Sequence, residues 1–208
     1  MFQNQHIFAC GKVPVMPTVK VATTSDEARV ISIMVLAFSA DPVVRWVWPD
    51  PQRYMMHFPS FVKAFGGKAF AIGSAYYVDD YAGAALWLPP NVHFDEEAVV
   101  AVLQATASEA IQQGGLGVFE QMAKYHPAEP HWYLPVLGVD PSRHSRGLGS
   151  AMMKHVLDQC DLDNKPAYLE SSNPRNIPFY KRQGFEVLGT IPAGGSLSVF
   201  PMLRKPRR

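Results

Sequence analysis

Residues 137–150 contain the feature that most limits how this chain can fold. The apolar segment 137–139 predicts a strand, Asp140-Pro141 predicts a turn, and the stretch from Gly147 onward has the apolar spacing of a helix. A strand that leads through a short loop directly into a helix is part of a strand–helix–strand unit. The second half of the chain is therefore expected to hold a sheet whose strands are joined by helices.

The loop between this strand and this helix has the chemistry of an anion site. The first backbone N–H groups of a helix have no partner within the helix, and the helix dipole is positive at that end. Gly147 and Gly149 lack side chains, so an anion can approach the backbone, and Arg143 and Arg146 add positive charge. The pattern indicates a phosphate cradle, with tight packing of strand on helix as the alternative. It differs from the dinucleotide-binding fingerprint, because the third glycine is missing.

A second informative segment follows and predicts a short capped helix. Asn173 is typical of an N-cap, Pro174 of the first helical position and Gly184 of the position after a helix. Asn176 and Tyr180 are four residues apart and therefore share one face of this helix. An amide and a phenol on one face suit a polar ligand, although a tyrosine ring is also compatible with a core position.

The remaining sequence predicts a mixed sheet with helices. The capping-box pair Thr24 and Glu27 predicts the start of a helix that ends before Asp41-Pro42. Further helices are expected over residues 54–65, 95–112, 118–125, 147–159 and 175–182. Residues 45–50 are expected to form an aromatic loop. Strands are expected over residues 19–22, 75–78, 82–88, 132–139, 167–171, 185–190 and 197–203.

These elements predict an α/β fold, in the α+β sense of a mixed sheet. One central sheet of about seven strands is expected, with helices on both faces. The hairpin at 75–88 supplies an antiparallel part, and the alternation of strands and helices later in the chain supplies a parallel part. Residues 19–208 are expected to form a single domain, and residues 1–18 an N-terminal extension.

Composition limits the partners. The formal net charge is +1, which gives no global attraction to nucleic acid or to a membrane surface, and no apolar run approaches the ~20 residues that cross a bilayer. Two scattered cysteines, Cys10 and Cys160, do not suggest a disulfide framework, and the N-terminus does not resemble a signal peptide. We therefore expect a cytoplasmic protein, monomeric or homodimeric, with neither nucleic acid nor membrane as a partner.

The two informative segments, in this order, resemble the GNAT superfamily of N-acetyltransferases. The resemblance covers roughly residues 20–206, and its pattern is most similar to the puromycin N-acetyltransferase branch at 126–134, 137–150, 169–171, 174–180 and 202–206. It implies an acyl-CoA N-acyltransferase fold and transfer of an acetyl group to an amine of a small molecule, of aromatic or antibiotic-like type. It does not identify the acceptor, because acceptor sites diverge on a shared fold.

The resemblance also implies acetyl-CoA as the cosubstrate. In the family, the loop binds the pyrophosphate, the preceding strand pairs with the pantetheine arm, and the later helix supplies further contacts. The matching residues here are Leu137, Gly138, Val139, His144, Ser145, Arg146, Gly147, Leu148, Gly149, Ser150, Asn176 and Tyr180. The family usually has Gln or Arg where His144 stands and Gly where Ser145 stands.

Two residues are candidates for proton transfer. The family tyrosine at the position of Tyr180 often protonates the departing thiolate, and a phenol pKa near ~10 is close to that of a thiol. Glu170 interrupts an otherwise apolar strand, and a buried carboxylate is costly without a partner or a purpose, so it is a candidate base. A structural role for Glu170, with a water chain as the base, is the alternative.

Aromatic residues are the candidates for the acceptor side, namely Trp46, Trp48 and Tyr133, although aromatic side chains are often part of the core. The histidines show no metal-ligand spacing, so no metal is expected. Acetylation of protein amines and a non-catalytic coenzyme A-binding module are the other functions that this pattern allows. The aromatic segment 45–50 and the helical segment after Pro90 favour a closed pocket for a small molecule.

Overall fold

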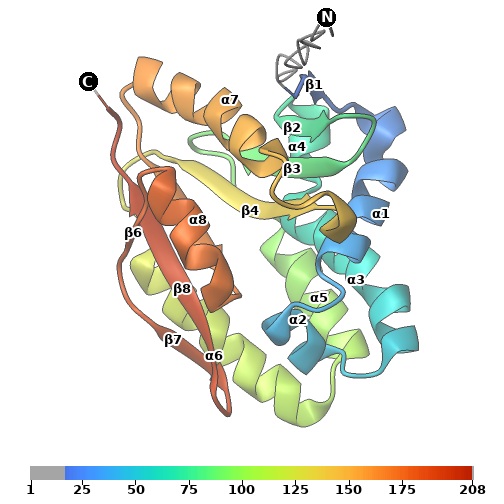
Figure 1. Cartoon of the computed structure of the whole chain (residues 1–208). Helices are drawn as coiled ribbons and strands as arrows, with labels where there is room; N and C mark the ends of the chain where they lie inside the picture. Colours follow the sequence, from blue (N-terminus) through green and yellow to red (C-terminus); the bar gives the residue numbers. More distant parts are fainter. Residues whose placement is uncertain (1–16, 208) are drawn as a thin grey trace, which may run out of the picture.

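The computed structural model describes residues 17–207 (Figure 1). The first half of the described chain is mainly helical. Its strands are β1 (Val19–Val21), β2 (Ala75–Val78) and β3 (Gly83–Leu88). Its helices are α1 (Glu27–Ala37), α2 (Pro42–Val47), α3 (Pro51–Gly66), α4 (Lys68–Ala71), α5 (Glu96–Thr106) and α6 (Glu109–Tyr125), and a short 3-10 turn, Thr24–Asp26, precedes α1.

The second half alternates strands with helices, as the sequence pattern predicts. Its strands are β4 (Trp132–Val139), β5 (Ala167–Ser171), β6 (Glu186–Val187), β7 (Ile191–Gly194) and β8 (Leu197–Arg204). Its helices are α7 (Leu148–Leu162) and α8 (Ile177–Arg182), and 3-10 turns at Pro141–Arg143 and Pro174–Asn176 lead into them.

The strands form one mixed sheet of eight strands in the order β1-β2-β3-β4-β5-β8-β6, with β7 paired to β8. β4 and β5 are parallel, and the other pairs are antiparallel. α7 makes the crossover that parallel neighbours require. The predicted mixed α/β sheet is confirmed, with eight strands instead of about seven. The additional strand is β7, which was missed because Pro192 and Gly194 are residues disfavoured in strands.

Helices cover both faces of this sheet (Figure 1). On one face α1, α3, α5 and α6 pack over a core that includes Met34, Phe58 and Leu86. On the other face α7 and α8 pack over a core that includes Met152 and Trp87. The sheet is therefore the middle layer of three, and its inner strands are buried on both sides, as the continuous burial of β3 shows.

A bulge in β4 controls where the central strands separate. Tyr133 pairs with Leu88 and Val136 pairs with Leu86, so two residues of β4 lie opposite one residue of β3. Pro135 occupies this bulge, which suits a proline because it has no N–H to donate to a neighbouring strand. The parallel pairing with β5 also ends here, at Leu134. Among the described residues, 135–139 of β4 therefore have no strand partner on the β5 side.

The start of the first long helix differs from the sequence prediction by one residue. The backbone N–H of Thr23 donates to the Asp26 carboxylate at 2.8 Å, so the capping pair is Thr23 and Asp26 instead of Thr24 and Glu27. Residues 23 and 24 are both threonine and residues 26 and 27 are both acidic, so the capping-box spacing fits either pair.

The predicted aromatic loop at 45–50 is wrong for its first half, because α2 extends to Val47. The Asp41 carboxylate caps α2 by accepting from the N–H groups of Val43 and Val44, both at 3.1 Å. Pro42 occupies the first helical position, where a proline is favourable.

The helices after Pro90 also divide differently from the prediction. A single helix over 95–112 was expected to break at Gly114-Gly115, but α5 ends at Thr106 and α6 begins at Glu109 and continues through both glycines. Ser108 is the N-cap of α6. Tertiary packing of the α6 apolar face outweighs the low helix propensity of glycine, which costs only about 1 kcal/mol per residue.

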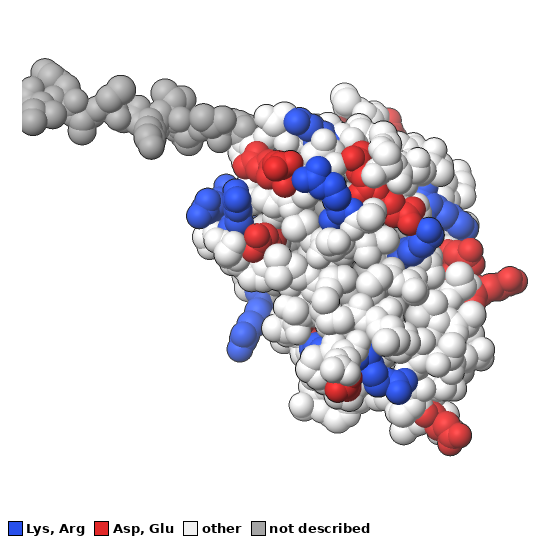
Figure 2. Space-filling view, turned by 90° about the vertical axis from the view of Figure 1, so that its right-hand side faces the viewer, with Lys and Arg blue, Asp and Glu red and all other residues white. Residues whose placement is uncertain are grey.

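The expected N-terminal extension, residues 1–18, and with it Cys10, lies almost entirely outside the described residues. Cys160 is buried in α7. Within residues 17–207, no helix has the length and apolar character needed to span a membrane. Acidic and basic side chains are intermingled on the face shown in Figure 2, around a broad uncharged area.

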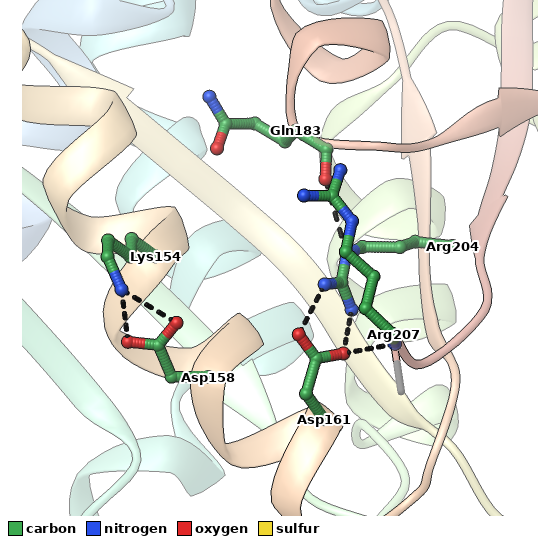
Figure 3. A network of polar contacts seen from close by, with 6 residues as sticks. All are labelled: Lys154, Asp158, Asp161, Gln183, Arg204 and Arg207. Atoms are coloured by element: carbon green, nitrogen blue, oxygen red, sulfur yellow. Dashed lines mark hydrogen bonds and ion pairs between the residues drawn. The ribbon is translucent and has the colours of Figure 1, made fainter.

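A buried arginine joins the end of β8 to α7 and α8 (Figure 3). The Arg204 side chain is 3% exposed, and its two terminal nitrogens donate to the Asp161 carboxylate at 2.8 and 2.7 Å. Its Nε–H donates to the carbonyl of Gln183 at 3.2 Å, and the backbone N–H of Arg207 donates to Asp161 at 2.7 Å. The hydrogen bonds from Arg204 hold the pKa of Asp161 below its ordinary value of 3.8.

Removing this arginine is expected to destabilise the fold. Arg204→Ala should lower the free energy of unfolding by about 2 kcal/mol, less than the roughly 3–5 kcal/mol of a fully buried pair, because Asp161 can still reach water. Lys154→Ala is the matched control, since Lys154 pairs with Asp158 on the exposed side of the same helix and should contribute only about 0.3–0.5 kcal/mol. Urea unfolding at neutral pH measures both losses, and equal losses would contradict the prediction.

The same comparison has an expected pH dependence. The folded-state pKa of Asp161 lies below the unfolded value, so its contribution to stability is complete above pH 3.8 and is lost as the pH falls through the folded pKa. The stability difference between wild type and Arg204→Ala should therefore shrink in acid.

Candidate active site

Two hollows meet where β4 and β5 separate. The first, called the loop cleft here, has a volume of 620 Å³ and lies between the end of α1, the loop after β4 and the start of α8. The second, called the apolar cavity, has a volume of 150 Å³ and lies between α2, α3, α6 and strands β4 and β5. Four residues line both hollows and so mark their junction: Phe38, Leu137, Asn176 and Tyr180.

The loop cleft brings together nearly all residues that the sequence assigned to the coenzyme. Those that line it are Leu137, Gly138, Val139, His144, Ser145, Gly147, Leu148, Gly149, Ser150, Asn176 and Tyr180. Arg146 is exposed and is not among the residues that line the cleft. The two segments selected from the sequence therefore face one hollow, although residues 151–172 separate them in the chain.

The loop after β4 has the backbone geometry of an anion site. Ser145 and Gly147 have positive φ angles of 62° and 78°, and Gly147 is the N-cap of α7. Glycine adopts this left-handed conformation without the steric penalty of other residues. An added Cβ at Gly147 would meet no described atom within 4 Å, so the cleft is open at the start of α7. The unpartnered N–H groups of the first helical turn can bind phosphate oxygens there.

His144 holds this loop against the strand. Its Nε2–H donates to the carbonyl oxygen of Val139 at 3.1 Å, and the Asp140 carboxylate accepts from the backbone N–H of Ser142 at 2.8 Å. These two contacts fix the turn between strand and helix. The residue at which this sequence departs from the family pattern thus contacts the backbone of β4.

Three arginines give the loop cleft a positive rim. Arg143 comes from the loop, whereas Arg175 and Arg182 come from the region of α8. The last two were not selected from the sequence, because only the fold shows that the start of α7 and the segment 173–182 share one hollow. Their guanidinium groups complement the phosphates of a nucleotide-containing ligand.

Tyr180 lies at the junction of the two hollows, on the buried face of α8. Its side chain is 8% exposed. Burial, and next the nearby carboxylate of Asp41, raise the pKa of Tyr180 above its ordinary value of 10. The phenol therefore keeps its proton at neutral pH and can act as a proton donor toward either hollow.

Asp41 is a buried carboxylate beside Tyr180 that the sequence marked only as the end of a helix. In addition to capping α2, it accepts from the hydroxyl of Ser172 at 2.7 Å. Burial raises the pKa of the Asp41 carboxyl. Asp41 thereby joins the start of α2, which forms one wall of the apolar cavity, to the chain just after β5.

Aromatic and aliphatic side chains form most of the apolar cavity. Among the described residues that line it, Glu170 is the only one of the Asp, Glu, Lys, Arg and His types. Its wall includes Phe38, Val44, Trp46, Trp48, Phe58, Phe61, Val62, Phe65, Val118, Phe119 and Met122. The phenylalanines on α3 were missed, because their helical spacing is equally typical of a core.

Trp46 of α2 and Trp48, the residue after its end, are the two tryptophans that the sequence suggested, and both line this cavity. Trp46 packs closely on β7, since a Cβ at Gly194 would lie 2.6 Å from its ring. Trp48 is 2% exposed, and its Nε1–H donates to the Thr106 hydroxyl at 3.1 Å. Trp48 is thus a core residue as well as part of the cavity wall.

Glu170 reaches the apolar cavity from β5, and its side chain is 5% exposed. Its Oε2 accepts from the hydroxyl of Tyr133 at 2.8 Å. Its Oε1 has no hydrogen bond with any described residue and lies 3.4 Å from Nε2 of His126. Tyr133, expected from the sequence to line the acceptor side, is not among the residues that line the apolar cavity and instead holds Glu170 in place.

Within residues 17–207, no group of three or more histidine, cysteine or acidic side chains is arranged to hold a metal ion.

Comparison with known families decides the assignment. The sequence model described as "Acetyltransferase (GNAT) family" matches residues 41–185, which include the loop after β4 and Tyr180. This chain belongs to the GNAT family of acetyltransferases.

Two curated relatives of this GNAT protein are acetyltransferases by name. An uncharacterized N-acetyltransferase of Schizosaccharomyces pombe is 23% identical over 174 residues, which are 77% of this chain and 70% of that protein. A mycothiol acetyltransferase of Salinispora tropica is 41% identical over 54 residues, which are 24% of this chain and 18% of that protein.

Solved GNAT structures share the fold. A Corynebacterium glutamicum structure, described as histone acetyltransferase HPA2 and related acetyltransferase, has a TM-score of 0.67 and 26% identity, covering 93% of this chain and 98% of that one. Arylalkylamine N-acetyltransferase 2 from Aedes aegypti has a TM-score of 0.63 and 14% identity, covering 92% and 99%. An agmatine N-acetyltransferase, also at 0.63 and 14%, covers 91% and 99%.

The GNAT family generally uses acetyl-CoA, and the glycine at the start of α7 provides a test of coenzyme binding. Gly147→Val should weaken coenzyme A binding by about tenfold, because the added side chain would occupy the open space at the start of α7 through which a phosphate approaches the backbone. Gly73→Val is the matched control, since Gly73 also has a positive φ, 71°, with no described atom within 4 Å of an added Cβ. Calorimetry should show normal affinity for the control, and normal affinity of a folded Gly147→Val would contradict this role.

Proposed function

We propose that this protein transfers the acetyl group of acetyl-CoA to the amine of a small, largely apolar molecule. The observation that carries the proposal is the junction at Tyr180, where a cleft suited to a nucleotide meets an apolar cavity with a single carboxylate. A donor with phosphates and an acceptor with one amine fit these two hollows. The two ligands would then meet beside a protonated phenol.

The loop cleft fits coenzyme A by three features. The first turn of α7, after Gly147, offers backbone N–H groups to the pyrophosphate. The unpaired edge of β4 at residues 137–139 offers hydrogen bonds to the amide groups of the pantetheine arm. Arg143, Arg175 and Arg182 offer charge to the remaining phosphate. Bound in this way, the cosubstrate supplies an activated acetyl thioester.

The apolar cavity indicates the acceptor class. An aromatic or aliphatic amine can bury its apolar part against Trp46 and Trp48 while its ammonium group approaches Glu170. The free Oε1 of Glu170 is a suitable partner for that ammonium group. A second charged group on the acceptor would find no partner in the described wall and would lose its hydration without compensation.

The chain's own residues can manage the two proton transfers that the reaction needs. The acceptor amine must lose a proton before it can attack, and the carboxylate of Glu170 can take it. The departing thiolate must gain a proton, and Tyr180, whose phenol is protonated at neutral pH and lies at the junction, can donate it. Orientation of both substrates at one junction supplies the rest of the advantage.

Acetylation of protein amines is the second candidate, because the Corynebacterium glutamicum structure named for a histone acetyltransferase is similar at 26% identity. The small apolar cavity of 150 Å³ favours a compact acceptor over an extended polypeptide. A non-catalytic coenzyme A-binding module is less consistent with Tyr180 at the junction of the two hollows and Glu170 in the adjoining apolar cavity.

A thiol-release assay with acetyl-CoA and an amine panel tests the proposal. The panel contains 2-phenylethylamine, tryptamine, puromycin as an antibiotic-type amine, agmatine, and a lysine-containing histone-tail peptide. We expect kcat/KM to be at least about tenfold higher for the aromatic monoamines than for agmatine, because agmatine's guanidinium would be buried without a partner. Preference for the peptide would support the second candidate, and binding without any turnover would support the sensor module.

Tyr180→Phe tests the proton donor. The substitution keeps the ring and its packing but removes the proton, so kcat should fall by about 10²–10⁴-fold while coenzyme A affinity changes little. Tyr76→Phe is the control, because it removes a hydroxyl at a residue that lines neither hollow. Melting curves verify that both variants are folded. A loss below about threefold for Tyr180→Phe would remove this residue from the mechanism and leave solvent as the donor.

A further inference from the structure

We infer that Glu170 and His126 form a path by which the proton of the acceptor amine leaves the apolar cavity. The inference rests on the proposed function and extends it by naming the group that receives the proton from Glu170. Glu170 lines the apolar cavity, whereas His126 lines a separate hollow of 220 Å³, called the histidine cavity here. The Glu170–His126 contact thus connects two hollows with different surroundings.

The histidine cavity is built from segments 91–94 and 126–131 and from Tyr133. His93, His126 and His131 all line it, and His93 is exposed. The His126 side chain is 25% exposed, in contrast to the 5% of Glu170. His126 is therefore the point at which a group next to Glu170 reaches water.

The hydrogen bonds of Glu170 leave one of its carboxylate oxygens free to contact His126. Tyr133 donates to Oε2, while Oε1 is buried without a hydrogen bond among the described residues and lies 3.4 Å from Nε2 of His126. That separation is beyond a normal hydrogen bond by a few tenths of an ångström, and catalytic contacts are often long before substrates bind. An unsatisfied buried carboxylate oxygen is expensive, and a role in proton transfer is one explanation for its retention.

The other groups that face His126 are less able to take the proton. Burial and the charge of Glu170 raise the pKa values of Tyr133 and Tyr168, so both phenols stay protonated. Burial lowers the pKa of His131, whose Nδ1–H donates to the carbonyl of Glu129 at 2.8 Å. The rings of Tyr168 and Tyr133 pack on His126 at 4.5 and 4.8 Å between centroids and hold it in position.

The position of His126 in the chain suits a transient positive charge. His126 is the C-cap of α6, and its N–H donates to the carbonyl of Met122 at 3.2 Å. The C-terminal end of a helix dipole favours a cation. An imidazole also changes its charge within the physiological pH range, as a relay requires. His131, with its ring centre 5.4 Å away, and the exposed Glu129 line the same cavity, where the imidazolium can release its proton to water.

The proton balance of the path is as follows. The acceptor enters as an ammonium ion, and one N–H bond breaks as its proton passes to the Glu170 carboxylate. The resulting carboxylic acid passes a proton to His126, which becomes imidazolium and restores the carboxylate. The imidazolium releases that proton to water in the histidine cavity. The second amine proton replaces the one that Tyr180 gives to the thiolate, so each turnover releases one proton net.

His126→Gln tests the path with the panel amine that the wild-type protein acetylates fastest. Glutamine keeps a hydrogen-bonding side chain but cannot carry a proton. We expect kcat/KM for the amine to fall by roughly 10²-fold, at the lower end of the usual contribution of acid–base catalysis, with unchanged coenzyme A affinity. The remaining activity should rise more steeply with pH than that of wild type, because hydroxide must then remove the proton.

His93→Gln is the matched control. It removes an imidazole from the same cavity without touching Glu170, and its kcat/KM should stay within about twofold of wild type. An equal loss in both variants would indicate a general effect of the cavity and would overturn the path. Normal kcat/KM and a normal pH profile for His126→Gln would also overturn it, while leaving the proposed function intact.

Rescue by a small base separates a relay from a structural role. His126→Ala opens space beside Glu170, next to the 220 Å³ histidine cavity, and added imidazole can occupy it. We expect the activity of His126→Ala to rise in proportion to the imidazole concentration, with little effect on wild type or on His126→Gln. A folded His126→Ala protein that is inactive at every imidazole concentration would contradict the path. A wild-type protein that acetylates no panel amine would overturn the proposed function together with this inference.

Discussion

The separation of β4 from β5 is the constraint on which the rest of the site depends. Adjacent parallel strands normally stay paired, and here the bulge at Pro135 ends that pairing after three residues of register. The extra residue also changes which side chains face which core, since Tyr133 and Val136 both pack in the larger core, whereas Leu134 and Leu137 pack in the other. One local irregularity therefore provides a free strand edge, and both hollows lie beside it.

Two buried carboxylates lie near this gap, and they differ in how completely their oxygens are hydrogen-bonded. Asp41 accepts from two backbone N–H groups and one hydroxyl, so its lone pairs are well satisfied. Glu170 has a normal hydrogen bond on only one oxygen. Native proteins satisfy most buried polar groups, and an exception at the meeting point of two hollows indicates a place for a ligand. The difference was invisible in the sequence, where each residue is a single acid in an apolar segment.

The second half of the chain was the part that the sequence predicted best. The spacing of apolar residues and the glycines and prolines between segments predicted β4, α7 and β5 with nearly their observed limits. The resemblance to the family predicted most of the residues that line the loop cleft. The apolar cavity was harder, because its phenylalanines on α3 have the same spacing as core residues. The relation of His126 to Glu170 was beyond reach, since it depends on where the end of α6 lies against β5. The positions of Arg175 and Arg182 depended in the same way on three-dimensional placement.

The order of the strands has a consequence for how the protein is made. β8 is the last described strand along the chain, yet it lies inside the sheet between β5 and β6 and also pairs with β7. While a ribosome is still synthesising β8, the edge of β5 that includes Glu170 has no partner and is open to pairing with another chain. The bidentate contact of Arg204 with Asp161 forms only when β8 is in place, so the β5 edge at Glu170 gains its partner strand and α7 gains its ion pair in the same step of folding.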